Sequence, residues 1–258
     1  IPVHAGCHRP LVRAPIFGQY SGATGLGGAE LPPPRKAAET RHAVTFLIDS
    51  LDEAVEAGTR ITLCTLGPLT NVAVALRMRP DIVRGLDRIV MMGGAYREAG
   101  NRTMTSEFNI LVDPHAAEIV FSSDVPIVAL GLDASHQALA TPARIEAIRS
   151  LGGPVCGLVA ELLTYWDRND PARYGGPGGP LHDPLVIGYL LRPEIFTTER
   201  TRVFVEYESE RTMGQTVADW FGKSGEAPNT DIVTRVDADA FYALLGESLA
   251  RYRETVGT

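Results

Sequence analysis

The sequence is poor in cysteine, has no excess of basic residues and lacks long apolar runs. Its three cysteines, Cys7, Cys64 and Cys156, are odd in number and far apart, which is atypical of a disulfide framework or a cysteine zinc site. We expect buried thiols in a reducing, cytoplasmic compartment. The net charge of -7 argues against a duplex nucleic-acid binder, which normally has a basic face. No membrane span or signal peptide is visible, so we expect neither nucleic acid nor membrane as a partner.

Familiar motifs for nucleophilic catalysis and phosphate binding are also missing. There is no Gly-x-Ser-x-Gly elbow, and no cysteine has a local catalytic signature. The glycine-rich residues 21–28 lack the Lys-Ser/Thr of a P-loop, and Pro32-Pro33-Pro34 follows where a phosphate-binding helix would run. This stretch is therefore interpreted as a loop near the mouth of a site.

What is present is an alternation of apolar strand-like runs with amphipathic segments. The predicted strands span residues 59–66, 88–92, 126–132 and 231–236. The predicted helices span residues 37–57, 70–76, 142–150, 154–168, 185–191 and 238–252, with another beginning at Asp113-Pro114 and a short turn at 80–85. Alternating apolar residues from Thr201 predict an antiparallel excursion near the C-terminus, whereas residues 169–180 hold too much Gly and Pro for regular structure.

This order predicts an α/β fold with a mostly parallel sheet flanked by helices, in one domain over residues 1–258. Ligands of such folds bind at the carboxyl ends of the strands. Leu66-Gly67, Met92-Gly93 and Asp133 are predicted to lie there. For Asp133, a role in a site and a role in a turn both stay open.

The stretch over residues 88–121 carries the densest polar chemistry. After its apolar strand come Asn101, Glu107 and Asn109, with Phe108 between the last two. These carboxylate and amide groups are suited to a small molecule rich in hydroxyls. The alternative is a long surface loop whose amides satisfy its own backbone.

A second candidate site is His182-Asp183-Pro184, at the start of an apolar helix. Asp183 is placed to cap that helix and to offer an oxygen to a hard cation, and His182 could act as a general acid toward a leaving group. The alternative is a plain capping Asp beside an exposed His.

Six stretches in order along nearly the whole chain resemble the inosine-uridine preferring nucleoside hydrolase family. They are Leu66-Gly-Pro-Leu-Thr-Asn-Val-Ala73, Val90-Met-Met-Gly-Gly-Ala95, Glu107-Phe-Asn-Ile with Asp113-Pro114, Gly131-Leu-Asp with His136-Gln-Ala-Leu, His182-Asp-Pro184, and Met213-Gly with Asp219. The resemblance implies a Rossmann-like fold and hydrolysis of the N-glycosidic bond of ribonucleosides by water bound to Ca²⁺. It also implies a role in purine or pyrimidine salvage and a homodimer or homotetramer.

The resemblance assigns roles to individual residues. Asp183 and the backbone carbonyl of Leu66 match metal ligands, and His182 matches the residue that protonates the departing base. The residues that match the substrate-binding set are Met92, Asn101, Glu107, Phe108 and Asn109, with Tyr165 and Trp166 as candidates for the base pocket. An oxocarbenium-like ribose is stabilised by such carboxylate and amide oxygens.

The sequence departs from the family at two places. It has no Asp-x-Asp-Pro-Gly-x-Asp-Asp motif, which supplies most metal ligands and the catalytic base, so the first two strand–helix units are expected to be missing. Ser21 and Ala23 stand where many members have His and Glu. We therefore expect a chain that is inactive unless that segment is supplied, or alternatively a non-catalytic nucleoside- or ribose-binding relative.

Overall fold

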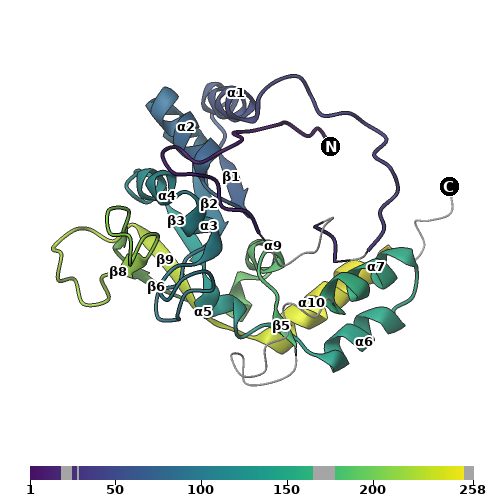
Figure 1. The fold of residues 1–258 in the computed structure, drawn as a ribbon. Coiled ribbons are helices and arrows are strands. Elements are labelled where there is room, and N and C mark those ends of the chain that lie inside the picture. The colour runs from purple at the N-terminus through teal and green to yellow at the C-terminus, as the bar shows by residue number, and fades with distance from the viewer. Residues whose placement is uncertain (19–24, 28, 165–177, 253–258) are drawn as a thin grey trace. The chain divides into compact units, whose positions relative to one another are not determined.

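The computed structural model describes residues 1–18, 25–27, 29–164 and 178–252 (Figure 1). The chain divides into two compact units, and each is described by itself. Unit 1 consists of Ile1–Ile16, Pro34–Asp133 and Thr198–Thr234, and unit 2 of Phe17–Pro33, Ala134–Thr197 and Arg235–Thr258. A single domain over the whole chain stays a prediction.

The main sheet has five strands in the order β1-β2-β3-β9-β6. They are β1 (Ile61–Thr65), β2 (Leu86–Met92), β3 (Ile127–Leu130), β9 (Thr230–Val236) and β6 (Phe196–Thr201). The pairs β1–β2, β2–β3 and β3–β9 are parallel, as predicted. All four residues of β3 are buried, because a parallel strand inside such a sheet is covered on both faces.

Unit 1 contains four α-helices, α1 (Ala43–Glu56), α2 (Thr70–Met78), α3 (Phe108–Val112) and α4 (Pro114–Phe121), and the 3-10 helix η1 (Pro80–Gly85). The predicted start of α1 at residue 37 is wrong. The N-cap is His42, whose ring nitrogen accepts from the Val44 N–H, and Glu39 is instead bridged to His4. The predicted cap at Asp113 is confirmed, since its carboxylate accepts from the Ala116 N–H.

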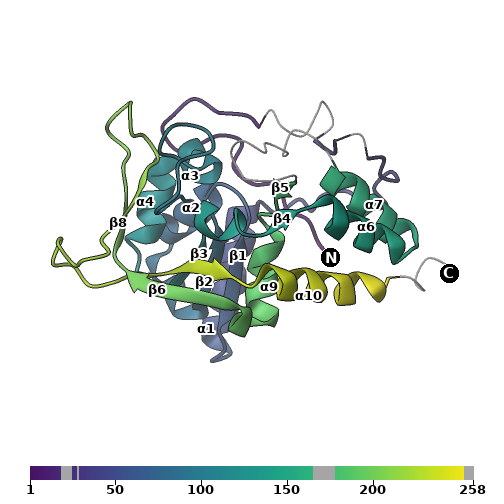
Figure 2. The ribbon, with the colours of Figure 1, turned by 90° about the horizontal axis from the view of Figure 1, so that it is seen from below.

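One face of the sheet in unit 1 is packed against α1, α2 and α4 (Figures 1 and 2). Alternate strand residues such as Ile89, Met91 and Ile127 enter one apolar cluster with Leu51 and Phe121 from the helices. These side chains are almost completely buried, and each contributes on the order of 1.5–3 kcal/mol relative to exposure. This packing fixes the strands whose ends carry the site.

The predicted antiparallel excursion is confirmed. Strands β7 (Val203–Val205) and β8 (Thr216–Ala218) pair antiparallel, with Val203 opposite Ala218. The Val205 N–H donates to Glu118 Oε2 at 2.9 Å, which ties β7 to α4.

Unit 2 is mainly helical. In the described residues of unit 2, the helices are α6 (Pro142–Ser150), α7 (Pro154–Thr164), α9 (Pro184–Leu191), α10 (Ala238–Ala250) and the 3-10 helix η3 (Pro193–Ile195). The short α5 (Leu132–Ser135) leads into it, and β4 (Leu139–Ala140) pairs antiparallel with β5 (Gly179–Pro180), a ladder too short to leave a sequence pattern. The caps at Thr141 and Asp237 are as predicted. In the part of the chain that the structure describes, no helix has the length and apolar character of a membrane span.

Candidate functional site

The carboxyl ends of three strands define one edge of the sheet in unit 1. Leu66-Gly67 follows β1, Gly93-Gly94 follows β2, and Gly131 to Asp133 follow β3. Because β1, β2 and β3 are adjacent and parallel, these segments lie at the same edge, as predicted.

Two glycines allow the ends of β2 and β3 to approach closely. Gly94 has φ +89°, and a Cβ there would lie 2.6 Å from Tyr96 Oη. A Cβ on Gly131 would lie 2.6 Å from the Gly94 carbonyl oxygen. That carbonyl accepts from the Leu132 N–H at 2.9 Å, so the two strand ends are joined directly.

Glu107 is the buried centre of this edge. Its carboxylate is the N-cap of α3, where Oε1 accepts from the Asn109 N–H at 2.9 Å and Oε2 from the Ile110 N–H at 3.2 Å. Oε2 also accepts from the Gly94 N–H at 3.1 Å. Three backbone donors therefore fix a carboxylate that is only 3% exposed.

Asn109 and Asn101 bind the backbone through different atoms of their side-chain amides. Asn109 Nδ2 donates to the Met92 carbonyl at 3.1 Å, which leaves Oδ1 with no donor among the described residues. Asn101 Oδ1 accepts from the Phe108 N–H at 3.0 Å, so the group that it can offer as a donor is its Nδ2. The amides do satisfy backbone groups, as the alternative interpretation held, yet Glu107 and Asn109 are buried rather than on the surface.

Asp133 binds the loop that follows β2. Its Oδ2 accepts from the Tyr96 N–H at 2.8 Å and its Oδ1 from the Arg97 N–H at 2.7 Å. Burial, followed by the charges of Asp133 and Glu107, raises the pKa of Tyr96 well above its ordinary value, so the phenol stays a neutral donor to the Gly93 carbonyl. Asp133 thus has the turn role that the sequence left open.

In unit 2, His182 and Asp183 precede α9. His182 Nδ1 lies 2.8 Å from the hydroxyl of Ser135, which is almost fully buried. The predicted side-chain cap at Asp183 is wrong. Asp183 is already helical, with φ -60° and ψ -39°, and makes no side-chain capping bond, because an N-cap side chain reaches its donors from an extended backbone.

The structure connects one set of predicted residues directly. Hydrogen bonds or chain adjacency in unit 1 join Met92, Asn101, Glu107, Phe108 and Asn109, and Leu66 lies at the same sheet edge. His182 and Asp183 belong to unit 2. Tyr165, Trp166, Ser21 and Ala23 lie outside the described residues.

Sequence reasoning missed two supporting contacts. Ser135 meets His182 from 47 positions away, and the Thr216 hydroxyl accepts from the Ala95 N–H at 3.0 Å and donates to its carbonyl at 2.8 Å. The partners in each contact lie far apart in the sequence, and a contact between distant positions leaves no periodic pattern by which it could be predicted.

Within the ranges that the structure describes, no group of three or more His, Cys, Asp or Glu side chains is arranged to hold a metal ion. Calcium takes about six to eight oxygen ligands. Asp183 and the Leu66 carbonyl supply fewer, so these two groups alone do not complete a calcium shell.

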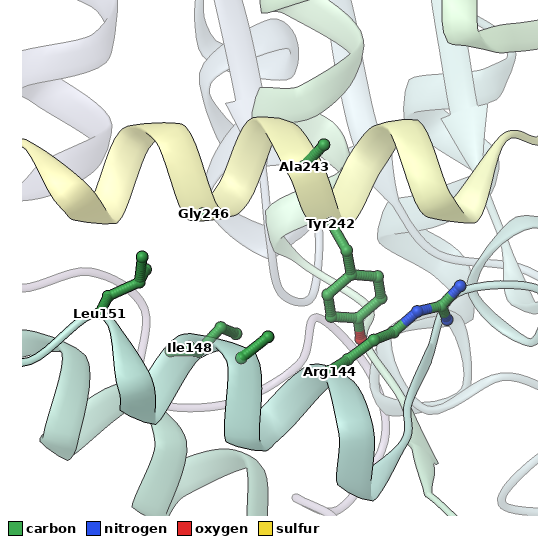
Figure 3. A pocket seen from close by; sticks show the side chains of 7 residues that line it. Arg144, Ile148, Leu151, Tyr242, Ala243 and Gly246 are labelled. Atoms are coloured by element: carbon green, nitrogen blue, oxygen red, sulfur yellow. The ribbon is translucent and has the colours of Figure 1, made fainter.

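A cavity of about 270 Å³ lies between α6 and α10 of unit 2 (Figure 3). Its walls are mostly apolar, and the Arg144 guanidinium lies over the Tyr242 ring at 4.4 Å. Arg144 is bound to the Leu139 carbonyl and Asp239. The cavity contains none of the predicted site residues and is a gap in helix packing.

Fixed carboxylate and amide groups at the carboxyl edge of a parallel sheet are typical of an α/β protein with a site for a small polar ligand. The family model of the inosine-uridine preferring nucleoside hydrolases matches residues 1–243. The chain belongs to this family. The predicted resemblance and fold are therefore confirmed.

Individual relatives agree with this assignment. The pyrimidine-specific ribonucleoside hydrolase RihA of Klebsiella pneumoniae is 44% identical over 254 residues, covering 98% of this chain and 80% of that protein. An uncharacterised protein of Schizosaccharomyces pombe is 45% identical, covering 97% and 81%. The purine-preferring ribonucleoside hydrolase from Gardnerella vaginalis has a similar structure, with a TM-score of 0.87 at 27% identity, covering 98% of this chain and 81% of that one.

Proposed function

We propose that this chain hydrolyses the N-glycosidic bond of ribonucleosides to free base and ribose. The observation that carries the proposal is the set of buried Glu107, buried Asn109 and half-buried Asn101, held by backbone hydrogen bonds at the carboxyl edge of the sheet. In a member of a nucleoside hydrolase family, a substrate with several hydroxyls is the ligand that such a set fits best.

The ribose is assigned to these three residues. A hydroxyl both donates and accepts, and Asn109 Oδ1 offers an acceptor while Asn101 Nδ2 offers a donor. Glu107 adds a fixed negative charge. As the glycosidic bond breaks, positive charge develops on the ribose ring, and an oriented carboxylate favours that state without having to reorganise.

His182 is assigned to the departing base. A nitrogenous base leaves more easily when it is protonated, and imidazole is the side chain whose ordinary pKa suits this transfer near neutral pH. The contact with Ser135 holds Nδ1 and thereby orients the ring. We assign the proton transfer to Nε2, on the opposite side of the ring. Met92, Phe108, Tyr165 and Trp166 are proposed as lining residues.

We further propose Ca²⁺ as the cofactor, with Asp183 and the Leu66 carbonyl among its ligands. A hard cation with oxygen ligands is suited to the vicinal hydroxyls of ribose. Asp183 and the Leu66 carbonyl are only part of its shell, and the ion, when bound, would fix the two ribose hydroxyls.

The proposed first substrates are uridine and cytidine. The relative that is named pyrimidine-specific shares 44% of its residues with this chain, whereas the purine-preferring structure shares 27%. A homodimer or homotetramer in the cytoplasm, acting in nucleoside salvage, completes the proposal. Light scattering after gel filtration measures the assembly.

The activity is tested by incubating the purified chain with uridine, cytidine or inosine and measuring free ribose and free base. Assays with calcium and with a chelator run in parallel. The assays are run with and without an added segment that carries the Asp-x-Asp-Pro-Gly-x-Asp-Asp motif, which this sequence lacks. With that segment we expect equimolar base and ribose, fastest from the pyrimidine nucleosides and reduced by chelation. Binding of uridine with no release of ribose under any of these conditions would contradict the proposal.

A further inference from the structure

Asp133 is connected to Glu107 through a short chain of backbone contacts, all within unit 1. Its two carboxylate oxygens accept from the consecutive N–H groups of Tyr96 and Arg97 at 2.8 and 2.7 Å. Two residues earlier, the Gly94 N–H donates to Glu107 Oε2 at 3.1 Å. The Asp133 carboxylate thus fixes the segment 94–97, and the first residue of this segment, Gly94, donates to the Glu107 carboxylate.

The segment between them has little freedom to compensate if Asp133 is lost. Its own glycine, Gly94, has positive φ, a conformation that the free chain leaves readily. Thr216 binds both backbone groups of Ala95, but it holds neither Gly94 nor Tyr96. The Leu132 N–H holds the Gly94 carbonyl at 2.9 Å, and Asp133, the next residue, adds the two bonds to Tyr96 and Arg97 that fix the chain as it leaves this turn.

We propose that Asp133 is a positioning residue for the ribose-holding carboxylate of Glu107, acting through the Gly94 amide. This inference rests on the proposed role of Glu107 in binding ribose. An Asn at position 133 keeps the shape but has one acceptor and one N–H₂ group, and that group opposes a backbone N–H. The turn then shifts, and a small misplacement of a substrate-holding group lowers the rate strongly.

Asp219 offers a matched control. Its carboxylate also accepts from two backbone N–H groups, those of Lys223 at 2.7 Å and Ser224 at 2.6 Å, in the exposed loop after β8. Asp219→Asn therefore removes the same kind of contact from a place that is not bonded to Glu107.

The first experiment is a double-mutant cycle with uridine. We expect Asp133→Asn to lower kcat/KM by about 10-fold or more, and Asp219→Asn to leave it within about 2-fold. In a Glu107→Gln background, Asp133→Asn should cause no further loss. If the losses in kcat/KM of Asp133→Asn and Glu107→Gln multiply in the double variant, Asp133 has a merely structural role and the proposal is overturned. Equal effects of Asp133→Asn and Asp219→Asn would overturn it as well.

The second experiment does not depend on turnover. Hydrogen exchange of the backbone amides is compared in the wild type, Asp133→Asn and the milder Asp133→Glu. We expect the Gly94 amide to lose protection together with Tyr96 and Arg97 in either Asp133 variant. If Gly94 stays as protected as in the wild type, Asp133 does not position it. A wild type that fails to hydrolyse nucleosides, but shows this linked protection, would contradict the proposed function and not the coupling.

Discussion

The two groups of predicted site residues are built in different ways. In unit 1, Glu107 and Asn109 are deeply buried, and their side chains hold the backbone as well as facing the proposed ribose. In unit 2, His182 Nδ1 contacts the Ser135 hydroxyl, and Asp183 does not cap the helix that it begins. The difference teaches that the first group combines binding with capping a helix, whereas the helix of the second group begins without a side-chain cap.

The largest expected effect is a loss of catalytic rate when His182, in unit 2, is substituted. His182→Ala should lower kcat for uridine by about 100-fold or more, because the base then leaves without a proton. The same variant should hydrolyse p-nitrophenyl riboside almost as well as the wild type, since that leaving group needs no proton. The two substrates are compared by steady-state kinetics. Equal losses on both would remove His182 from the role of general acid.

Glu107→Gln should damage both catalysis and stability. We expect a loss in kcat/KM of about 10- to 100-fold for uridine, because the amide lacks the negative charge that favours the oxocarbenium-like state. The free energy of unfolding should fall by about 1–3 kcal/mol, because the buried N–H₂ group faces backbone donors. Urea denaturation measures the second effect. Glu194→Gln, at an exposed carboxylate of η3, is the control and should leave stability within about 0.5 kcal/mol.

Asp183→Ala should separate ion binding from folding. The variant should bind Ca²⁺ more weakly by about 10-fold, as measured by calorimetry. Without calcium, the variant loses no capping bond of α9, so any change in its unfolding free energy comes from the other contacts of Asp183. Asp237→Ala provides the contrast, since Asp237 does cap α10 and its loss should cost about 1 kcal/mol.

The smallest expected effect is the acid response of Asp219. Hydrogen bonds from the Ser224 side chain and from the backbone of Ser224 and Lys223 lower the pKa of its carboxyl to about 2. Its folded pKa lies below its ordinary value, so its contribution to stability is present above about pH 4 and disappears as the pH falls toward 2. The stability difference between the wild type and Asp219→Asn should therefore shrink over that range. A difference that is constant with pH would contradict this assignment.

The sequence predicted much of the fold because the fold follows local patterns. The parallel strands, the antiparallel excursion and the caps at Asp113, Thr141 and Asp237 all depend on nearby residues. The start of α1 was misplaced because Glu39 is bridged to His4, a contact between distant positions. The conformation of Asp183 was missed because Asp-Pro fits both a cap and a first helical turn.

The site was predictable as a set of residue types and much less as a geometry. The nature of Glu107, Asn109 and His182 indicated carboxylate, amide and imidazole chemistry. The orientation of each amide depends on single backbone partners such as the Met92 carbonyl, which no spacing rule reveals. The roles of Asp133 and Ser135 depend on contacts across 37 and 47 positions.

The two ends of the loop between β2 and α3 are anchored independently, and this has a consequence for engineering. Asp133 and Thr216 hold its beginning, and Ser106 Oγ donates to the Met213 carbonyl at its end. Met104 at its tip is 77% exposed. The Met104 carbonyl accepts from the Gly100 N–H at 3.2 Å, next to Asn101, so the backbone of the tip is tied to the proposed site. The Met104 side chain is therefore a position at which composition can be varied, whereas a change of loop length there would move Asn101.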